Sequence, residues 1–124
     1  MRNLSKTTLR AKSMGSTKKH IGYIYNGIVL KVVDGDTLDI MLDLGFATYR
    51  KVRCRLLDFN APEAKTIEGD KITAYLREYI TDQNVVVTSK SLDRYGRSLA
   101  YVHLIENGTL TNITSVLAAQ FPTN

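Results

Sequence analysis

The sequence predicts an α+β fold that is mainly β, in which a small barrel of five strands carries two helices. Two observations support this prediction. Short runs rich in Val, Ile and Tyr are separated by turns that contain Gly or Asn, as in a meander of strands. Two other segments, one in the middle of the chain and one near its end, repeat their apolar residues with helical spacing.

The strand-like runs share a high content of β-branched and aromatic residues. They cover residues 21–33, 37–42, 51–59, 84–89 and 98–105. The Asp-Gly pair within 34–36 is a strong hairpin signal between the first two runs. Apolar and polar residues alternate in the second run, so we expect Asp39 and Asp43 on a solvated face. Pro62, which has no amide hydrogen to donate, follows the third run.

Helical spacing begins after the third run. Apolar side chains recur there three and four residues apart, at Ile72, Tyr75, Leu76, Tyr79 and Ile80. This stripe predicts an amphipathic helix, and we expect Asp70 to cap its start. A shorter helix is expected over residues 112–119, after a turn at 107–108.

The size and composition of the chain limit its organisation. With 124 residues it is long enough for one domain with a single core. No apolar run reaches the roughly 18 to 20 residues that span a bilayer, and the N-terminal stretch lacks the apolar part of a secretory signal. We therefore expect a cytoplasmic protein without a membrane partner. Cys54 is the single cysteine, which excludes an internal disulfide, and we expect it to be a buried small hydrophobe.

The formal net charge of +5 is concentrated at the N-terminus. Seven of the 17 Lys and Arg residues precede Asp34 and no acidic residue does, whereas the rest of the chain holds 10 basic and 12 acidic residues. We expect residues 1–20 to be a basic, disordered arm and residues 21–124 to be the folded domain. Such an arm is able to bind nucleic acid by neutralising phosphates. A leader without a role is the alternative.

Three short polar clusters follow strand-like runs, at residues 34–37, 60–63 and 93–97. They offer two oxygen donors that suit hard cations, Asp36 and Asn60. They also offer a carboxylate, Glu63, and a permanent cation, Arg97, to which the third run adds Arg55. This combination suits a metal-assisted attack of water on a phosphodiester. Taken singly, each residue has a structural alternative, because Asp often caps turns and Arg is common on barrel surfaces.

In combination, the motifs resemble the staphylococcal (thermonuclease-type) nuclease family. The resemblance rests on Val-Asp-Gly-Asp-Thr from Val33, Arg-Leu-Leu-Asp-Phe-Asn-Ala-Pro-Glu from Arg55 and Asp-Arg-Tyr-Gly-Arg-Ser-Leu-Ala-Tyr from Asp93, and it covers roughly residues 21–120. It implies a five-stranded, OB-fold-like barrel that binds one calcium ion, with magnesium or manganese as alternatives. It also implies sequence-tolerant hydrolysis of DNA and RNA that leaves 3′-phosphate ends.

The resemblance also implies a metal site. The family's first carboxylate ligand matches Asp36, the second matches Asn60, a carbonyl ligand matches Ala61, and Asp34 matches a nearby supporting acid. Asn60 departs from the family pattern, which has aspartate at this position. An amide oxygen is an accepted calcium ligand, but one negative charge is lost, so we expect weaker metal binding.

For catalysis, the resemblance implies that Glu63 handles the attacking water and that Arg55 and Arg97 bind the phosphate. Tyr95 is expected to contact the nucleotide, and Arg94 to add a phosphate contact. The expected partners are therefore DNA, RNA or both, and a homo-oligomer is left open although the sequence does not indicate one.

Two features favour other interpretations. The family usually continues into a third helix beyond the position that corresponds to Asn124, so we expect a weaker grip on substrate. Together with Asn60, this leaves open a non-catalytic module of the same fold that binds nucleic acid or protein, or a generic OB-type single-strand binder. The presence of Glu63 and both arginines favours the enzyme.

Overall fold

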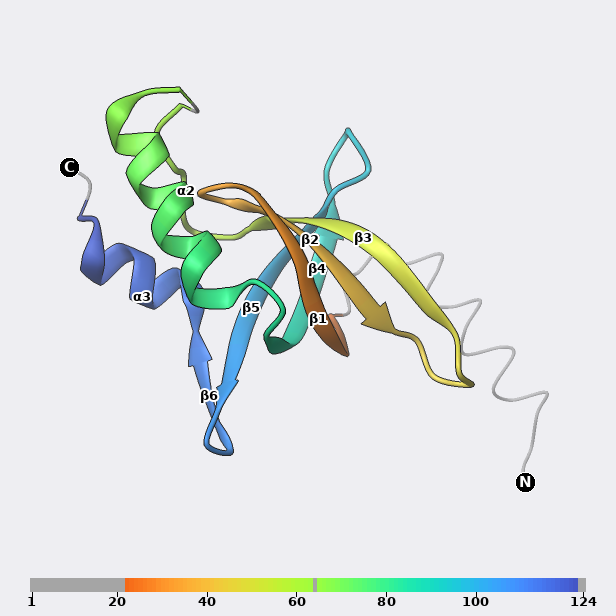
Figure 1. The fold of residues 1–124 in the computed structure, drawn as a ribbon. Helices are drawn as coiled ribbons and strands as arrows, with labels where there is room; N and C mark the ends of the chain where they lie inside the picture. The colour runs from red at the N-terminus through yellow and green to blue at the C-terminus, as the bar shows by residue number, and fades with distance from the viewer. Residues whose placement is uncertain (1–21, 64, 123–124) are drawn as a thin grey trace.

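The computed structural model describes residues 22–63 and 65–122. These residues form a twisted barrel with two helices on the same side of it (Figure 1). In chain order the elements are β1 (Tyr23–Asp34), β2 (Thr37–Asp43), β3 (Tyr49–Leu56), α2 (Ile67–Ile80), β4 (Asn84–Leu92), β5 (Ser98–Glu106), β6 (Thr109–Asn112) and α3 (Ile113–Gln120). The arm predicted over residues 1–20 lies outside the described residues, so it stays a prediction.

Five strands close the barrel. Antiparallel pairing joins β3 to β2, β2 to β1, β1 to β4 and β4 to β5. A short parallel contact between residues 54–56 of β3 and residues 98–100 of β5 completes the ring. The predicted fold class, a mainly β, OB-fold-like barrel with two packed helices, is therefore confirmed.

The strand β6 is not indicated by the sequence pattern. It has four residues and pairs antiparallel with the second half of β5, from His103 opposite Asn112 to Glu106 opposite Thr109. A run this short shows no alternation of apolar and polar residues. Its position is set by the tight turn before it, at which both central residues, 107 and 108, have positive φ.

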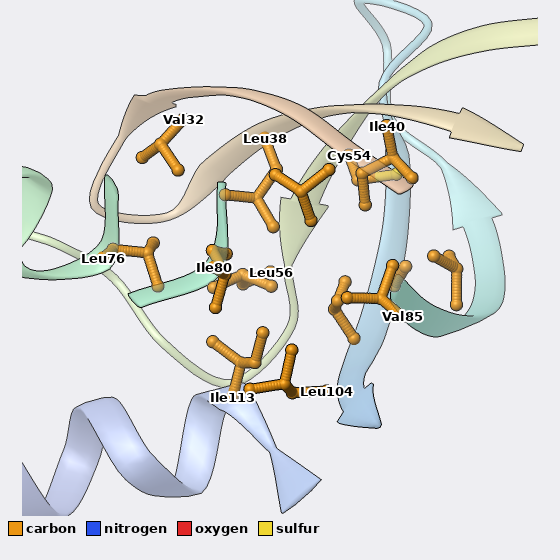
Figure 2. Packing of buried hydrophobic residues seen from close by; sticks show 14 of the residues in the cluster. Val32, Leu38, Ile40, Cys54, Leu56, Leu76, Ile80, Val85, Leu104 and Ile113 are labelled. Atoms are coloured by element: carbon orange, nitrogen blue, oxygen red, sulfur yellow. The ribbon is translucent and has the colours of Figure 1, made fainter. Parts of the chain in front are cut away.

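The core fills the barrel and the space between the barrel and the helices (Figure 2). Leu38 and Ile40 of β2 are fully buried, as are Leu76 and Ile80 of α2 and Ile113 of α3. Each such side chain contributes about 1.5–3 kcal/mol through its removal from water. This packing makes a rigid support for the strand ends, where the polar clusters lie. Among the described helices, neither is long and apolar enough to cross a membrane.

Asp39 does not lie on a solvated face as predicted; it is 5% exposed. Its cross-strand neighbour is Arg53. The Nε and Nη2 atoms of Arg53 donate to the two carboxylate oxygens at 2.8 and 3.1 Å, and the long side chain covers the acid. These hydrogen bonds hold the pKa of Asp39 below its ordinary value, against the opposing effect of burial. The alternation correctly separates Asp39 from the core-facing residues of β2. It does not indicate that Arg53 covers this acid, because that contact depends on how β2 pairs with β3.

The cap of α2 also differs from the prediction. The helix begins at Ile67, and Thr66 is its N-cap, with Oγ1 accepting a hydrogen bond from Gly69 N at 3.0 Å. Asp70 lies inside the first turn, where its negative charge interacts favourably with the helix dipole.

The third strand ends at Leu56 and not at Phe59. The chain turns at Asp58, whose φ of 63° lies in the left-handed region. Leu57 N still donates to Ala100 O of β5 at 3.0 Å, and after this turn the chain leaves the sheet, so that the second polar cluster lies on the loop of residues 57–63.

We predict that the Cys54 thiol is inert in the folded protein. It is fully buried, and burial raises its pKa to about 12, so almost no thiolate forms near neutral pH. Ellman's reagent at pH 8 is expected to leave the native protein unmodified and to react fully in concentrated urea. Rapid labelling of the native protein would contradict this packing.

Candidate active site

The turn between β1 and β2 holds a nearly buried carboxylate, Asp36, which is 9% exposed. Its Oδ1 accepts a hydrogen bond from Thr37 Oγ1 at 3.0 Å, and its Oδ2 accepts one from Ala61 N at 2.8 Å. The second bond joins two loops that are 25 residues apart in the sequence. Asp34 organises the same turn, because its Oδ1 accepts from Asp36 N at 3.2 Å.

Gly35 lets three segments meet at this turn. A Cβ atom at this position would lie 2.7 Å from Ile72 Cγ2 and 2.8 Å from Ala61 Cβ, closer than side-chain atoms approach one another. The glycine therefore has a packing role that is independent of its backbone freedom. It brings the β1–β2 turn, the 57–63 loop and α2 into direct contact.

Arg55 shapes the loop that follows β3. Its Nη1 donates to the carbonyl oxygens of Leu56 and Phe59 at 3.0 and 2.9 Å. Its Nη2 donates to Asn60 Oδ1 at 2.6 Å. Nη1 also lies 3.4 Å from Asp36 Oδ2, so the guanidinium is an ion-pair partner of the buried carboxylate. One side chain thus connects the loop, Asn60 and Asp36.

The two carboxylates of the turn titrate as a pair with opposite shifts. Burial raises the pKa of Asp36, and its side-chain hydrogen bond with Asp34 adds to this, while Ala61 N–H and the charge on Arg55 act against it. Burial also acts to raise the pKa of Asp34, but hydrogen bonds with Asp36 and Thr37 and the charge on Arg55 outweigh it, so that this pKa is lowered. Both carboxylates compete for the same positive partner.

The donor set here suits a hard cation. Within residues 22–63 and 65–122, no three His, Cys, Asp or Glu side chains gather at metal-binding distance. A cation at this position would therefore depend on the Asp36 carboxylate together with neutral oxygens, from the Asn60 amide and the Ala61 carbonyl. Calcium accepts such a mixture of carboxylate, amide and backbone oxygens, whereas a structural zinc site prefers thiolate and imidazole.

The β4–β5 hairpin carries the second arginine. Arg97 Nε donates to Asp93 Oδ2 at 2.6 Å, and Arg97 N donates to Asp93 Oδ1 at 2.9 Å. The hydrogen bonds from Arg97 hold the pKa of Asp93 below its ordinary value, although desolvation acts to raise it. Tyr95 at the tip is 74% exposed. The guanidinium carbons of Arg94 and Arg97 lie 5.9 and 5.6 Å from its ring centre.

Several of the predicted residues meet in one pocket of about 290 Å³. Arg55 and Asn60 form one wall, and Asp93 and Arg97 form the other. The predicted ligand Asp36 borders this group through its ion pair with Arg55. Arg94 and Tyr95 are at the hairpin tip, outside the lining of the pocket.

Glu63 has an exposed side chain, and within the described part of the chain it makes no hydrogen bond or ion pair. Its backbone, in contrast, is held firmly. The carbonyl oxygen accepts from Thr66 Oγ1 at 2.7 Å and from Thr66 N at 3.2 Å. A Cβ atom at Gly69 would collide with this carbonyl oxygen, so α2 packs directly on the Glu63 backbone.

Sequence reasoning did not assign roles to Asp93, Thr66 and Asp58. Asp93 orients Arg97, and the signal was available, because Asp and Arg four residues apart flank a Gly-containing hairpin turn. Thr66 is one of the usual N-cap residue types just before the helix. Asp58 accepts a hydrogen bond from Tyr101 Oη at 2.6 Å, a contact between residues 43 positions apart that no local pattern indicates.

Comparisons with known proteins agree with this architecture. Residues 53–120 match the family model described as "Staphylococcal nuclease homologue". This matched segment contains Arg55, Asn60, Glu63 and Arg97, whereas Asp36 lies before it.

Individual proteins are similar over a longer part of the chain. A protein from Shigella flexneri named micrococcal nuclease is 34% identical over 96 residues, which are 76% of this chain and 52% of that protein. Protein ParB from Escherichia coli is 37% identical over 61% of this chain and 40% of its own length. An uncharacterized endonuclease from Escherichia coli O157:H7 is 36% identical over 63% of this chain and 48% of its own length. The chain thus spans about half the length of the curated relatives it matches.

We predict that the Thr66 hydroxyl is required to fix the start of α2 against the Glu63 carbonyl. Thr66→Val is expected to lower the free energy of unfolding by about 1 kcal/mol, since it removes the N-cap acceptor. Thr66→Ser keeps the hydroxyl and is expected to remain within about 0.5 kcal/mol of the parent protein. Urea unfolding followed by circular dichroism measures both. Equal destabilisation by Ser and Val would show that the hydroxyl is not responsible.

Proposed function

The chain belongs to the staphylococcal nuclease homologue family, and we propose that it is a calcium-dependent nuclease that hydrolyses phosphodiester bonds of DNA and RNA. The observation that carries this proposal is the meeting of Arg55, Asn60 and Arg97 in one pocket beside the buried carboxylate of Asp36. Few other activities require two permanent cations next to a set of hard oxygen donors.

Asp36, Asn60 and the carbonyl of Ala61 are the residues that would hold the cation. When bound, calcium supplies polarisation of the phosphoryl oxygens and increased acidity of a bound water. Asp34 supports the turn through its hydrogen bond from Asp36 N. In this scheme Arg55 keeps the Asp36 carboxylate paired while no cation is bound.

The two arginines bind the phosphate and stabilise the charge that develops on it. The planar guanidinium groups of both residues match paired phosphate oxygens. Asp93 holds Arg97 by Nε, and within the described residues the two terminal nitrogens of Arg97 make no hydrogen bond, so they are available to a phosphate. Because these groups are oriented by protein contacts before substrate binds, little reorganisation is required during the reaction.

Glu63 orients the attacking water and accepts its proton. Its exposed carboxylate is accessible to solvent, and its backbone is held by Thr66 and by the contact with Gly69. Attack on phosphorus in line with the leaving group, with departure of the 5′-oxygen, would leave the phosphate on the 3′ end. This product is expected from the family resemblance.

A non-catalytic binding module of the same fold is the second candidate function. It is favoured by one contact, the 2.6 Å hydrogen bond through which Arg55 Nη2 occupies Asn60 Oδ1. If this bond persists in solution, the amide oxygen has only one remaining lone pair for a cation. Such a module would still bind phosphates through Arg97.

We predict that the protein cleaves plasmid and single-stranded DNA with calcium and not with EDTA, with magnesium and manganese as further tests. Glu63→Gln is expected to lower kcat by about 10²–10⁴-fold, because it removes the proton acceptor. Arg97→Ala is expected to cost about 10²–10³-fold through loss of charge stabilisation. Glu68→Gln, an equivalent change at an exposed position in the first turn of α2, is the control.

The same assay decides between the two candidate functions. Metal-dependent cleavage that Glu63→Gln loses and Glu68→Gln retains supports the enzyme, and end-group analysis of the products then tests the 3′-phosphate. Binding of DNA by clean wild-type protein without cleavage in any divalent ion would establish the binding module instead.

We also predict that Asn60→Asp strengthens calcium binding. The affinity of oxygen sites increases with the charge of their ligands, so the dissociation constant is expected to fall by about an order of magnitude. Calorimetric titration with calcium measures this change directly. Asn84→Asp adds the same charge at an exposed position on β4 and serves as the control. Equal effects of the two substitutions would indicate general electrostatics and argue against Asn60 as a ligand.

A further inference from the structure

The loop that follows β3 is anchored at its start by contacts that involve neither of the proposed phosphate-binding arginines. Leu57 is held from two sides, because its N–H donates to Ala100 O of β5 at 3.0 Å and its carbonyl oxygen accepts from Thr114 Oγ1 of α3 at 3.1 Å. The next residue, Asp58, accepts a hydrogen bond from Tyr101 Oη of β5 at 2.6 Å. The start of the loop is therefore attached to β5 and α3.

Asp58 has a backbone conformation that is rare for residues other than glycine. Its φ of 63° lies in the left-handed region, where a side chain with a Cβ atom is disfavoured. Asp tolerates this region better than most residues, but such a conformation persists only where the surroundings fix it. Within residues 22–63 and 65–122, the bond from Tyr101 is the only side-chain hydrogen bond that Asp58 makes. The Tyr101 hydroxyl is thus the contact that fixes this side chain at the turn.

The contacts further along the loop use groups of the site itself. Arg55 donates to Asn60 Oδ1 at 2.6 Å and forms an ion pair with Asp36. Under the proposed function a phosphate engages Arg55 and a cation engages Asp36 and Asn60, so the ligands compete with both contacts. The hydrogen bond at Asp58 involves none of these groups. It therefore remains available to hold the loop while a cation and a phosphate are bound.

Asp58 is part of the candidate site, whereas its partner is not. Asp58 lines the same pocket as Arg55 and Asn60, and Tyr101 is outside this lining. Asp58 precedes Asn60 by two residues and Ala61 by three, so a shift of its backbone moves both proposed ligands. The bond to the carboxylate raises the pKa of Tyr101 above its ordinary value, so the hydroxyl remains a donor at neutral pH. Tyr101 therefore acts on the site through Asp58.

We propose that Tyr101 is a positioning residue for the candidate active site. It fixes Asp58 and thereby the part of the loop that carries Asn60 and the Ala61 carbonyl. The importance of this loop for metal binding rests on the proposed function, whereas the contact itself is open to test without metal or substrate. In this arrangement the Tyr101 hydroxyl holds the loop in place and Arg55 is left to bind the phosphate. Tyr101 contributes no group to the reaction.

The test is hydrogen exchange of the Ala61 amide, measured by NMR on the full chain in EDTA. This amide donates to Asp36 Oδ2 at 2.8 Å, so its exchange reports opening of the loop. Tyr101→Phe removes only the hydroxyl and is expected to accelerate exchange at Ala61 by about fivefold, the order expected for loss of one hydrogen bond. The Leu44 amide, which donates to Thr48 O in the β2–β3 turn, is the internal reference and is expected to keep its exchange rate.

Matched variants separate the hydrogen bond from other effects. Tyr49→Phe removes a hydroxyl from a tyrosine that is 61% exposed on β3, and it is expected to leave exchange at Ala61 unchanged. Asp58→Asn keeps an oxygen acceptor and tolerates the left-handed region, so it is expected to retain most of the protection. Asp58→Gly removes the acceptor while it favours the backbone conformation. In the Asp58→Gly background, Tyr101→Phe is expected to have no further effect.

The outcomes keep the positioning role apart from the proposed function. Faster exchange at Ala61 in Tyr101→Phe but not in Tyr49→Phe supports the role, even if the protein never cleaves DNA. Unchanged exchange at Ala61, or an equal acceleration at Leu44, overturns it. Calcium is then added to the wild-type protein. Slower exchange at Ala61 with calcium supports the proposed ligands, and an unchanged rate contradicts them while the result in EDTA stands.

Discussion

The carboxylate of Asp36 is the group on which the arrangement of the site depends. It is almost removed from water, and it accepts a hydrogen bond from the backbone of the 57–63 loop while pairing with Arg55. A buried carboxylate without such partners would cost several kcal/mol, so each partner is required where it is. The β1–β2 turn, the end of β3 and the following loop are consequently held in one geometry by one side chain.

The helix α2 supports the same geometry by packing against both the β1–β2 turn and the 57–63 loop. It contacts the β1–β2 turn through Ile72 at Gly35, and it contacts the loop through Gly69 at the Glu63 carbonyl. Gly35 is needed because the β1–β2 turn approaches α2 closely, and Gly69 is needed because α2 approaches the backbone of the 57–63 loop closely. Most of the chemistry-bearing side chains lie on loops, whereas Arg55 lies near the end of β3. Rigid elements position the loops, which is the usual division between scaffold and site.

Five of the six strands, the α2 stripe and the three polar clusters were predictable because each depends on local patterns. Alternation identifies the strands, helical spacing identifies α2, and the order of the motifs indicates that they converge. Asp39 shows where local patterns stop being sufficient. Its burial follows from the register that places Arg53 opposite it, and register is a property of two strands together. The hydrogen bond from Tyr101 to Asp58 arises in the same way, because the barrel brings β5 beside the end of β3.

Asn60 changes the electrostatic balance of the site in two opposing directions. With an aspartate at this position, Arg55 would face two carboxylates and would be largely neutralised by them. With the amide, Arg55 makes a hydrogen bond to a neutral oxygen and keeps more of its positive field, apart from its contact with Asp36. Compared with an aspartate at position 60, the amide offers a cation one charged ligand fewer. An incoming phosphate is repelled by one negative charge fewer and is attracted more strongly by Arg55. If the site works as proposed, an amide at this position therefore weakens binding of the cation and strengthens binding of the anionic substrate.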